Sequence, residues 1–137
     1  MENHFKLNDT ELQLQFTDCS LDPSLFSHEA HLRLAWIHIQ KYGLESAIQN
    51  LCKQIAAYAT SVGATDKFNN TVTVAAIKAV YHFIQKSKSD NFRDFIQEFP
   101  RLQHNFKELM NAHYGFDIFT LERAKRTFME PDLLPFD

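Results

Sequence analysis

Residues 27–44 read SHEAHLRLAWIHIQKYGL, and this stretch decides the fold class. Ser27 is a favoured N-cap residue, because its hydroxyl can accept a hydrogen bond from a backbone N–H of the first helical turn. Apolar side chains recur at helical spacing as far as Tyr42, and Gly43 then stands where a left-handed residue commonly ends a helix. The stretch therefore predicts a helix from His28 to Tyr42.

The same helical spacing recurs on both sides of this stretch. Further helices are expected over residues 10–18, 44–62, 71–84, 92–99, 102–114 and 121–128. Their expected N-caps include Thr10, Asn69 or Asn70, and Thr120. The run Thr71–Val74 favours a strand locally because its four residues are β-branched, but apolar spacing continues to Ile84 and favours a helix.

The composition agrees with a helical fold. The 137 residues include three glycines and four prolines, about 5% of the chain where average usage is ~12%. Sandwiches and barrels need these residues at many turns, so their scarcity argues against an all-β fold. The expected fold is all-α, a compact single domain (1–137) with a bundle of five to six helices at 27–128. An N-terminal segment (1–26) with a short helix precedes this bundle, and an extended tail (129–137) follows it.

Charge and cysteine content restrict the partners and the compartment. The 14 basic and 17 acidic residues give a net charge of −3, whereas nucleic-acid binders usually carry a basic patch. No stretch approaches the ~18 apolar residues of a membrane span, and the N-terminus lacks the pattern of a signal peptide. Cys19 and Cys52 have no metal-motif spacing and are too few for a disulfide scaffold. We therefore expect a cytoplasmic protein that binds neither nucleic acid nor a membrane.

The predicted helix at 28–42 carries a stripe of polar side chains beside its core face. At about 100° per residue, the stripe consists of His28, His31, His38 and Tyr42. Three other polar side chains are expected to face away from the core: Glu29, Arg33 and Gln40. The simplest interpretation is that the histidines are partly buried and hydrogen-bonded to neighbouring helices.

Two functional interpretations of the stripe stay open beside that one. In the first, His28 and His31 bind a metal ion, which needs at least a third ligand from elsewhere in the chain. In the second, the stripe lines a polar pocket for a small molecule. His28 lies in the first helical turn, where the helix dipole disfavours protonation, so that a neutral imidazole can orient a ligand or act as a general base.

A second candidate lies at the start of the predicted helix at 71–84. The N–H groups of a helix start can hold a carboxylate or phosphate, and Asn69, Thr71 and Thr73 supply polar side chains there. The competing interpretation is ordinary capping by asparagine and hydrogen bonding of the threonines to the backbone. Four polar side chains crowd a helix start that needs one cap, and this crowding favours the binding interpretation.

These segments resemble a family of small, functionally uncharacterised bacterial proteins. The resemblance is carried by Phe26-Ser27-His28-x-x-His31-Leu32-Arg33-x-Ala35-Trp36, by Lys67-Phe68-Asn69-x-Thr71-Val72-Thr73, and by Glu130-Pro131-Asp132 with Pro135. It implies a helical single domain in which His28, His31, Thr71, Thr73 and Asp132 belong to one functional region. The family pattern has Tyr-His where this chain has Phe68-Asn69, which implies a lost or altered activity in this member.

The leading hypothesis is a small-molecule-binding helical protein. Its pocket is expected near the starts of the helices at 28 and 71, closed by the C-terminal tail. His28 and His31 would orient the ligand, Trp36 would form an apolar wall, and a polar or anionic group would be held by Asn69, Thr71 and Thr73. No cofactor is expected.

Two alternatives belong to other functional classes. A histidine-based enzyme, with or without a metal ion, would use His28 as its general base or metal ligand. A protein-interaction module or homodimer would bury exposed parts of the stripe formed by Phe92, Phe95 and Phe99 against its partner.

Overall fold

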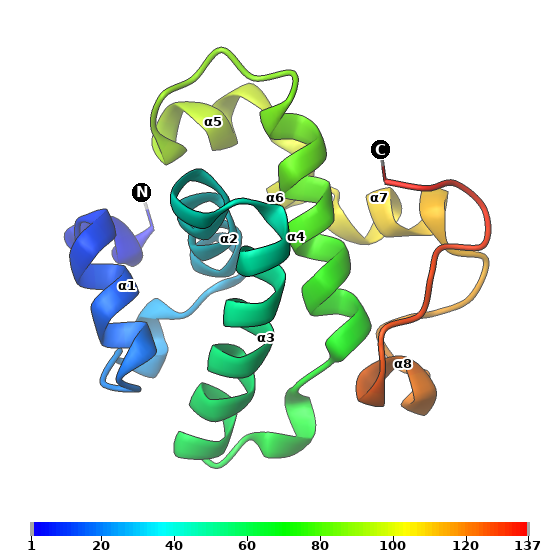
Figure 1. The fold of residues 1–137 in the computed structure, drawn as a ribbon, viewed down its shortest axis with the longest axis horizontal. Helices are drawn as coiled ribbons and strands as arrows, with labels where there is room; N and C mark the ends of the chain where they lie inside the picture. The colour runs from blue at the N-terminus through cyan, green and yellow to red at the C-terminus, as the bar shows by residue number, and fades with distance from the viewer. Residues whose placement is uncertain (1, 137) are drawn as a thin grey trace. The chain divides into compact units, whose positions relative to one another are not determined.

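The computed structural model describes residues 2–136 and confirms the all-α class (Figure 1). Within those residues there is no strand, and six helices have seven or more residues, as expected. The α-helices are α1 (Asp9–Thr17), α2 (His28–Tyr42), α3 (Leu44–Ser61), α4 (Asn70–Ile84), α5 (Phe92–Glu98), α6 (Arg101–His104), α7 (Phe106–His113) and α8 (Glu122–Arg126). Short 3-10 helices lie at η1 (Asn3–Lys6), η2 (Pro23–Leu25) and η3 (Thr65–Lys67).

The contacts of the chain fall into two compact units. Unit 1 runs from Met1 to Phe68 and contains α1 to α3, and unit 2 runs from Asn69 to Asp137 and contains α4 to α8. The expected single domain stays a prediction. No helix within residues 2–136 has both the length and the apolar character needed to cross a membrane.

Unit 1 is built on the packing of α2 against α3, with α1 against both. The ring of Phe16 from α1 lies 4.9 Å from the rings of Phe26 and Tyr58, which joins α1 and α3 through one aromatic cluster. The Tyr58 hydroxyl donates a 2.7 Å hydrogen bond to the Leu21 carbonyl. Each buried aromatic ring removes apolar surface from water, and the tyrosine hydroxyl also has a hydrogen-bond partner.

The boundaries of α2 agree with the prediction, and the reason is local. The Ser27 hydroxyl accepts a hydrogen bond from the Ala30 N–H, and Gly43 ends the helix at φ 86° and ψ 170°. This region of backbone space is accessible to glycine and hardly to any residue with a Cβ. Helices α2 and α3 therefore need a glycine at their junction.

Replacing Gly43 with alanine is expected to destabilise unit 1 by about 1–3 kcal/mol. No atom lies within 4 Å of the added Cβ, so the cost comes from the backbone conformation alone. Urea unfolding followed by the fluorescence of Trp36, the one tryptophan in the chain, measures the change. Gln40→Ala, at an exposed position of α2, is the control and should change stability by less than about 0.5 kcal/mol. An equally small effect of Gly43→Ala would contradict the expectation.

In unit 2, α4 packs against α8 and α6 against α7. The ring of Phe99 lies 4.9 Å from that of Phe83 and 5.5 Å from that of Phe95. Phe92 and Phe95 are buried. These two members of the stripe therefore belong to the core of unit 2, whereas Phe99 is half-buried, and a protein partner for its exposed part stays a prediction.

Residues 127–136, after α8, form no helix and return along α7 (Figure 1). The His113 carbonyl accepts hydrogen bonds from the N–H groups of Leu133 and Leu134, and the His113 ring stacks on Phe136 at 4.1 Å. The prediction of an extended tail is thus confirmed as far as Phe136, and residue 137 lies outside the described part of the chain.

Three helix ends differ from the prediction. The expected helix at 102–114 divides at Asn105, which follows α6 and whose carbonyl accepts the first hydrogen bond of α7 from Leu109. The Asn105 side chain donates a 2.8 Å hydrogen bond to the Glu108 carboxylate, and asparagine in general favours helix ends over helix interiors. The first helix is capped by Asn8 in a capping box with Glu11, and Thr10 lies inside it.

The last helix is shorter than expected and does not begin at Thr120. The Asp117 carboxylate accepts a hydrogen bond from the Phe119 N–H, which forms a turn just before Thr120. Helix α8 then begins at Glu122 and ends at Arg126, so Phe128 lies beyond it.

Gly115 directly follows Tyr114, the C-cap of α7, and so lies at a helix end, as its position in the sequence predicts. Its N–H donates a 2.7 Å hydrogen bond to Asp132, and a Cβ at this position would lie 3.0 Å from the Asp132 carboxylate. The close atom is the end of the exposed Asp132 side chain, so a Cβ at residue 115 would require this carboxylate to move by a few tenths of an ångström.

Candidate functional site

The histidine stripe of α2 is only partly buried. His38 is buried, His31 is half-buried, and His28 and Tyr42 are exposed. The buried Nε2 of His31 and both ring nitrogens of His38 have no hydrogen-bond partner among residues 2–136. The expectation that neighbouring helices satisfy these histidines by hydrogen bonds is therefore wrong for these three nitrogen atoms.

Burial controls the charge of both residues. Loss of hydration lowers the pKa of His31 to about 4, and the nearby His28 adds to the effect. Burial also lowers the pKa of His38 to about 4, with a further contribution from Lys41. Both imidazoles are neutral at pH 7, so each offers one donor and one acceptor nitrogen.

The face of α2 expected to point to solvent is instead covered by the N-terminal segment. Glu29 is 5% exposed and Arg33 is 4% exposed, so two of the three residues predicted to face away from the core are buried. Gln40, the third, is exposed as expected. The covering residues belong to η1 and to the start of α1, where His4 is 1% exposed.

Arg33 uses all of its hydrogen-bonding capacity on this segment. Its Nε and Nη2 donate to Asp9 at 3.1 and 2.9 Å, and Nη2 also donates to the Leu7 carbonyl at 2.9 Å. Its Nη1 donates to the His4 carbonyl at 2.9 Å and lies 3.2 Å from His4 Nδ1. These five contacts equal the five N–H groups of a guanidinium, and the Phe5 ring lies 5.4 Å from its centre.

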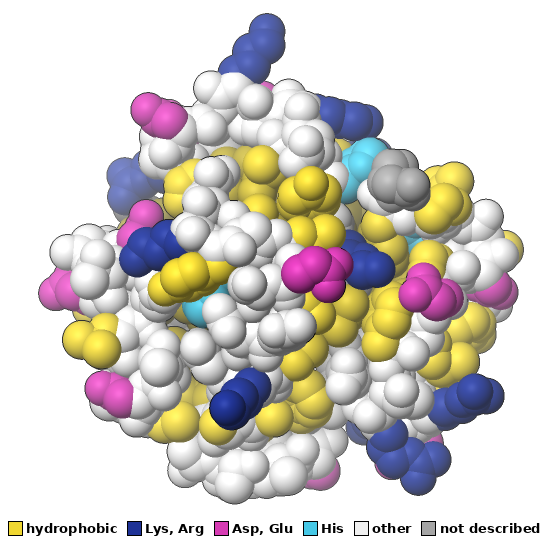
Figure 2. Space-filling model, in the orientation of Figure 1, with side chains coloured by type: hydrophobic (Ala, Val, Ile, Leu, Met, Phe, Trp, Pro, Cys, Tyr) yellow, Lys and Arg dark blue, Asp and Glu magenta, His cyan; other side chains and the backbone are white. Residues whose placement is uncertain are grey.

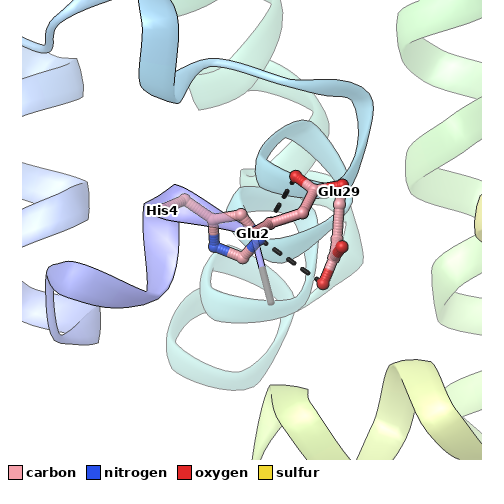
Figure 3. Close-up of side chains that lie close together, drawn as sticks. All are labelled: Glu2, His4 and Glu29. Carbon is pink, nitrogen blue, oxygen red and sulfur yellow. Dashed lines mark ion pairs between the residues drawn. The ribbon is translucent and has the colours of Figure 1, made fainter.

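Beside Arg33, three side chains form a group with the composition of a metal site (Figure 3). The carboxylates of Glu2 and Glu29 both point toward the His4 ring, at 3.8 and 3.4 Å from Nε2. One potential ligand atom from each of the three lies within 4.8 Å of the others. Three ligands of this type and spacing can surround a divalent cation in principle. We name this group the Glu2–His4–Glu29 cluster.

The protonation of His4 argues against a metal ion in this cluster. Arg33 can only donate, so His4 Nδ1 must accept, and the proton of the neutral ring then lies on Nε2 and faces the two carboxylates. A metal ligand needs a lone pair on Nε2 and a hydrogen-bond acceptor beside Nδ1, whereas here Nδ1 faces a cation. Burial and the Arg33 charge lower the pKa of His4 to about 4, against an opposing effect of Glu2.

The cluster therefore fits a structural role better than a metal centre. Nδ1 of neutral His4 lies against the Arg33 guanidinium, its Nε2 faces the two carboxylates at 3.4 and 3.8 Å, and the Ser27 hydroxyl donates a hydrogen bond to Glu2. Within residues 2–136 this is the one group of three potential ligands at such spacing, so His28 and His31 have no comparable third ligand.

The predicted site residues of unit 2 form hydrogen bonds within that unit. Asn69 caps α4 by accepting from the Val72 N–H and donates to the Ile118 carbonyl at 2.8 Å. The buried Thr71 hydroxyl donates to the Thr127 carbonyl and accepts from the Met129 N–H, both at 3.0 Å. The hydrogen bond from Val72 agrees with the capping interpretation for Asn69. The hydrogen bonds of Thr71 instead join the start of α4 to the segment after α8.

Replacing Thr71 with valine is expected to cost about 2 kcal/mol, because it leaves the part-buried Thr127 carbonyl and Met129 N–H without their hydrogen-bond partner. Thermal unfolding followed by circular dichroism measures the loss. Thr71→Ser keeps the hydroxyl and is the matched control, with an expected cost near 1 kcal/mol for the lost methyl group. Equal effects of the two substitutions would show that the hydroxyl does not contribute.

The other predicted site residues have different surroundings. Thr73 and Trp36 are buried in the core, at 3% and 7% exposure. Asp132 is exposed and accepts the hydrogen bond from Gly115. The structure thus assigns backbone contacts to Asn69, Thr71 and Asp132, and none of the three lines either of the two hollows described next.

Each unit has a hollow on its surface. The hollow in unit 1 has a volume of about 190 Å³ and is almost wholly apolar, with Phe26, Tyr58 and Phe68 in its lining and Lys67 as its one charged residue. The hollow in unit 2 has a volume of about 250 Å³ and is lined by apolar groups together with Lys86 and Arg101. On the face of the molecule in Figure 2, Lys and Arg side chains are interspersed with Asp and Glu, and no single sign of charge dominates that face.

Sequence reasoning missed Glu2, His4 and the buried role of Arg33. Part of the signal was present, because Asn8 and Glu11 have the spacing of a capping box and place a helix start directly after this segment. An arginine and a glutamate four residues apart on α2, Glu29 and Arg33, also indicate one shared face.

Comparison with known proteins identifies no relative. The chain matches no protein-family model, and neither a curated protein nor a solved structure is similar to it. The resemblance to a bacterial family therefore stays a prediction, and function has to be argued from the geometry of this chain.

Proposed function

We propose that the protein binds a small molecule at the amino-terminal end of α2, through His31 and the neighbouring His28. One observation carries the proposal: Nε2 of His31 is buried and has no hydrogen-bond partner within the described chain. A buried polar atom without a partner costs about 1–3 kcal/mol, and such costs are typical of binding and catalytic sites.

The chemistry of the two residues indicates what the ligand offers. Because burial keeps His31 neutral, its Nε2 either donates one hydrogen bond or accepts one. His28 is exposed at the first turn of the same helix, where it can meet a ligand that approaches from solvent. A ligand with a hydroxyl or amide group fits these two histidines better than a positively charged ligand does.

The other parts of the predicted pocket receive less support. Asn69 and Thr71 already have hydrogen-bond partners within unit 2, so we do not include them in the binding site.

The two cysteines bear on the compartment. Cys19 and Cys52 are free thiols, which supports a reducing compartment and hence the cytoplasm.

A ligand screen by thermal shift tests the proposal. The screen uses a panel of small metabolites that carry hydroxyl or amide groups, against the wild-type chain, His31→Leu and His38→Leu. A ligand at 100 times its Kd stabilises the native state by about 2.7 kcal/mol, which raises Tm by several degrees. We expect at least one compound to shift the wild type and His38→Leu but not His31→Leu. Equal shifts in all three proteins, or no shift with any compound, would contradict the proposal.

A further inference from the structure

The hollow in unit 2 combines an apolar lining with positive charge. His82 and Lys86 line it from the end of α4 and the turn after it, and Arg101 does so from the first position of α6. The rings of Phe83 and Phe136 supply apolar surface. Three separate parts of the chain thus contribute to one concave surface of about 250 Å³.

The charges on the described lining residues of this hollow all have one sign. No carboxylate is among its described lining residues, and neither Lys86 nor Arg101 forms an ion pair within residues 2–136. Both side chains are exposed, so they can reach a bound anion without losing an existing partner. A concave surface with one sign of charge attracts ligands of the opposite sign.

The C-terminal segment gives the hollow a fixed wall. His113 Nδ1 donates a 2.7 Å hydrogen bond to the Leu134 carbonyl, and the His113 ring stacks on Phe136. The Leu133 N–H donates a further 3.0 Å hydrogen bond to the His113 carbonyl. The wall is therefore held by several contacts to α7, and a ligand meets a hollow that is already formed.

We propose that this hollow binds a small carboxylate whose apolar body is a single ring or a short branched chain. The planar guanidinium of Arg101 matches the two oxygens of a carboxylate, and Lys86 adds a second positive charge. The apolar lining favours a ligand with a hydrophobic body over a bare inorganic anion. A cavity of 150 Å³ accommodates benzene, so about 250 Å³ suits one ring with a carboxylate arm. This site is separate from the His31 site and does not depend on it.

Titration with 3-phenylpropionate, followed by the backbone amide signals in NMR, tests this inference on the full chain. We expect saturable shifts that map to Phe83, Ala112, Leu134 and Phe136, with a Kd below about 1 mM, as suits a ligand of this size. The uncharged 3-phenylpropionamide should bind at least tenfold more weakly, because it lacks the negative charge. Inorganic phosphate at constant ionic strength should also bind at least tenfold more weakly, because it lacks the apolar body.

Substitutions separate the parts of the site. Arg101→Met and Lys86→Met should each weaken 3-phenylpropionate binding about tenfold, and Ala112→Phe, at an exposed lining position of α7, should abolish it by filling the hollow. Lys107→Met removes an exposed cation of α7 that does not line the hollow and is the matched control, with Kd within twofold of the wild type. His31→Leu should leave this Kd unchanged, which distinguishes the two proposals.

Four results would overturn the inference: no saturable binding of 3-phenylpropionate at 10 mM, equal affinity for the amide or for phosphate, shifts that map outside the hollow, or an unchanged Kd for Arg101→Met.

Discussion

Acidification from pH 7 to pH 5 is expected to destabilise unit 1 by roughly 3–5 kcal/mol. Three histidines carry the effect, because burial lowers the pKa of His4, His31 and His38 to about 4 in the folded chain. In the unfolded chain a histidine has a pKa near 6.5, so between pH 6.5 and 4 the unfolded state binds protons that the folded state does not. The stabilising contribution is thus complete above pH 6.5 and is lost as the pH falls toward 4, by roughly 1–2 kcal/mol per histidine at pH 5.

Urea unfolding at pH 7, 6 and 5, followed by Trp36 fluorescence, measures this dependence. In the double variant His31→Leu/His38→Leu, the change in stability between pH 7 and pH 5 should be about one-third of the wild-type change, since one of the three histidines remains. His104→Gln removes an exposed histidine of unit 2 and is the control for a change in histidine content. Equal stability of the wild type at pH 7 and pH 5 would contradict the expectation.

Replacing Arg33 with methionine is expected to destabilise unit 1 by about 3–5 kcal/mol. The substitution keeps an apolar side chain of similar length but leaves the Asp9 carboxylate and the carbonyls of His4 and Leu7 without their cationic donor. The cost is large because several acceptors lose their donor at once, and a buried acceptor without a partner costs about 1–3 kcal/mol.

The matched control is Arg126→Met, at an exposed position of α8, with an expected change below about 0.5 kcal/mol. Arg33→Lys keeps the charge but offers three donors in place of five, so its stability should lie between those of the wild type and Arg33→Met. A loss below 1 kcal/mol for Arg33→Met would show that the network does not hold the N-terminal segment in solution.

The fold could be predicted where the signals are local. Helix α2 has its cap at Ser27 and its end at Gly43 because both depend on the conformation of a single residue, which the sequence specifies directly. The run Thr71–Val74 is helical despite its β-branched residues, because Val74, Ile77 and Val80 are buried on one face of α4.

The environment of α2 could not be predicted in the same way. Periodicity places Glu29 and Arg33 on one face, but it does not show that a segment some 25 residues earlier covers that face. A charged residue is exposed by default, and it is buried only where partners such as Asp9 and His4 satisfy it. Those partners are separated from α2 in sequence, and their contacts depend on tertiary structure.

The candidate site was only partly accessible from the sequence. The crowding of polar residues at 69–73 was correctly noticed, yet two of these residues bind the backbone of segments 49 to 58 residues further along the chain. The stripe on α2 was also found, but periodicity cannot tell which of its nitrogen atoms lack partners. That difference separates His31, with its unsatisfied Nε2, from a histidine such as His113, which has a partner in Leu134.

The stability of His31→Leu without ligand tests the central claim most directly. Leucine has nearly the volume of histidine and no polar atom, so it should pack at this position without the cost of the unpaired nitrogen. If His31 is kept for binding, urea unfolding at pH 7, followed by Trp36 fluorescence, should show unchanged stability or a gain of about 1 kcal/mol. A loss of 2 kcal/mol or more would mean that His31 stabilises the fold, and this would contradict its assignment as a ligand-binding residue.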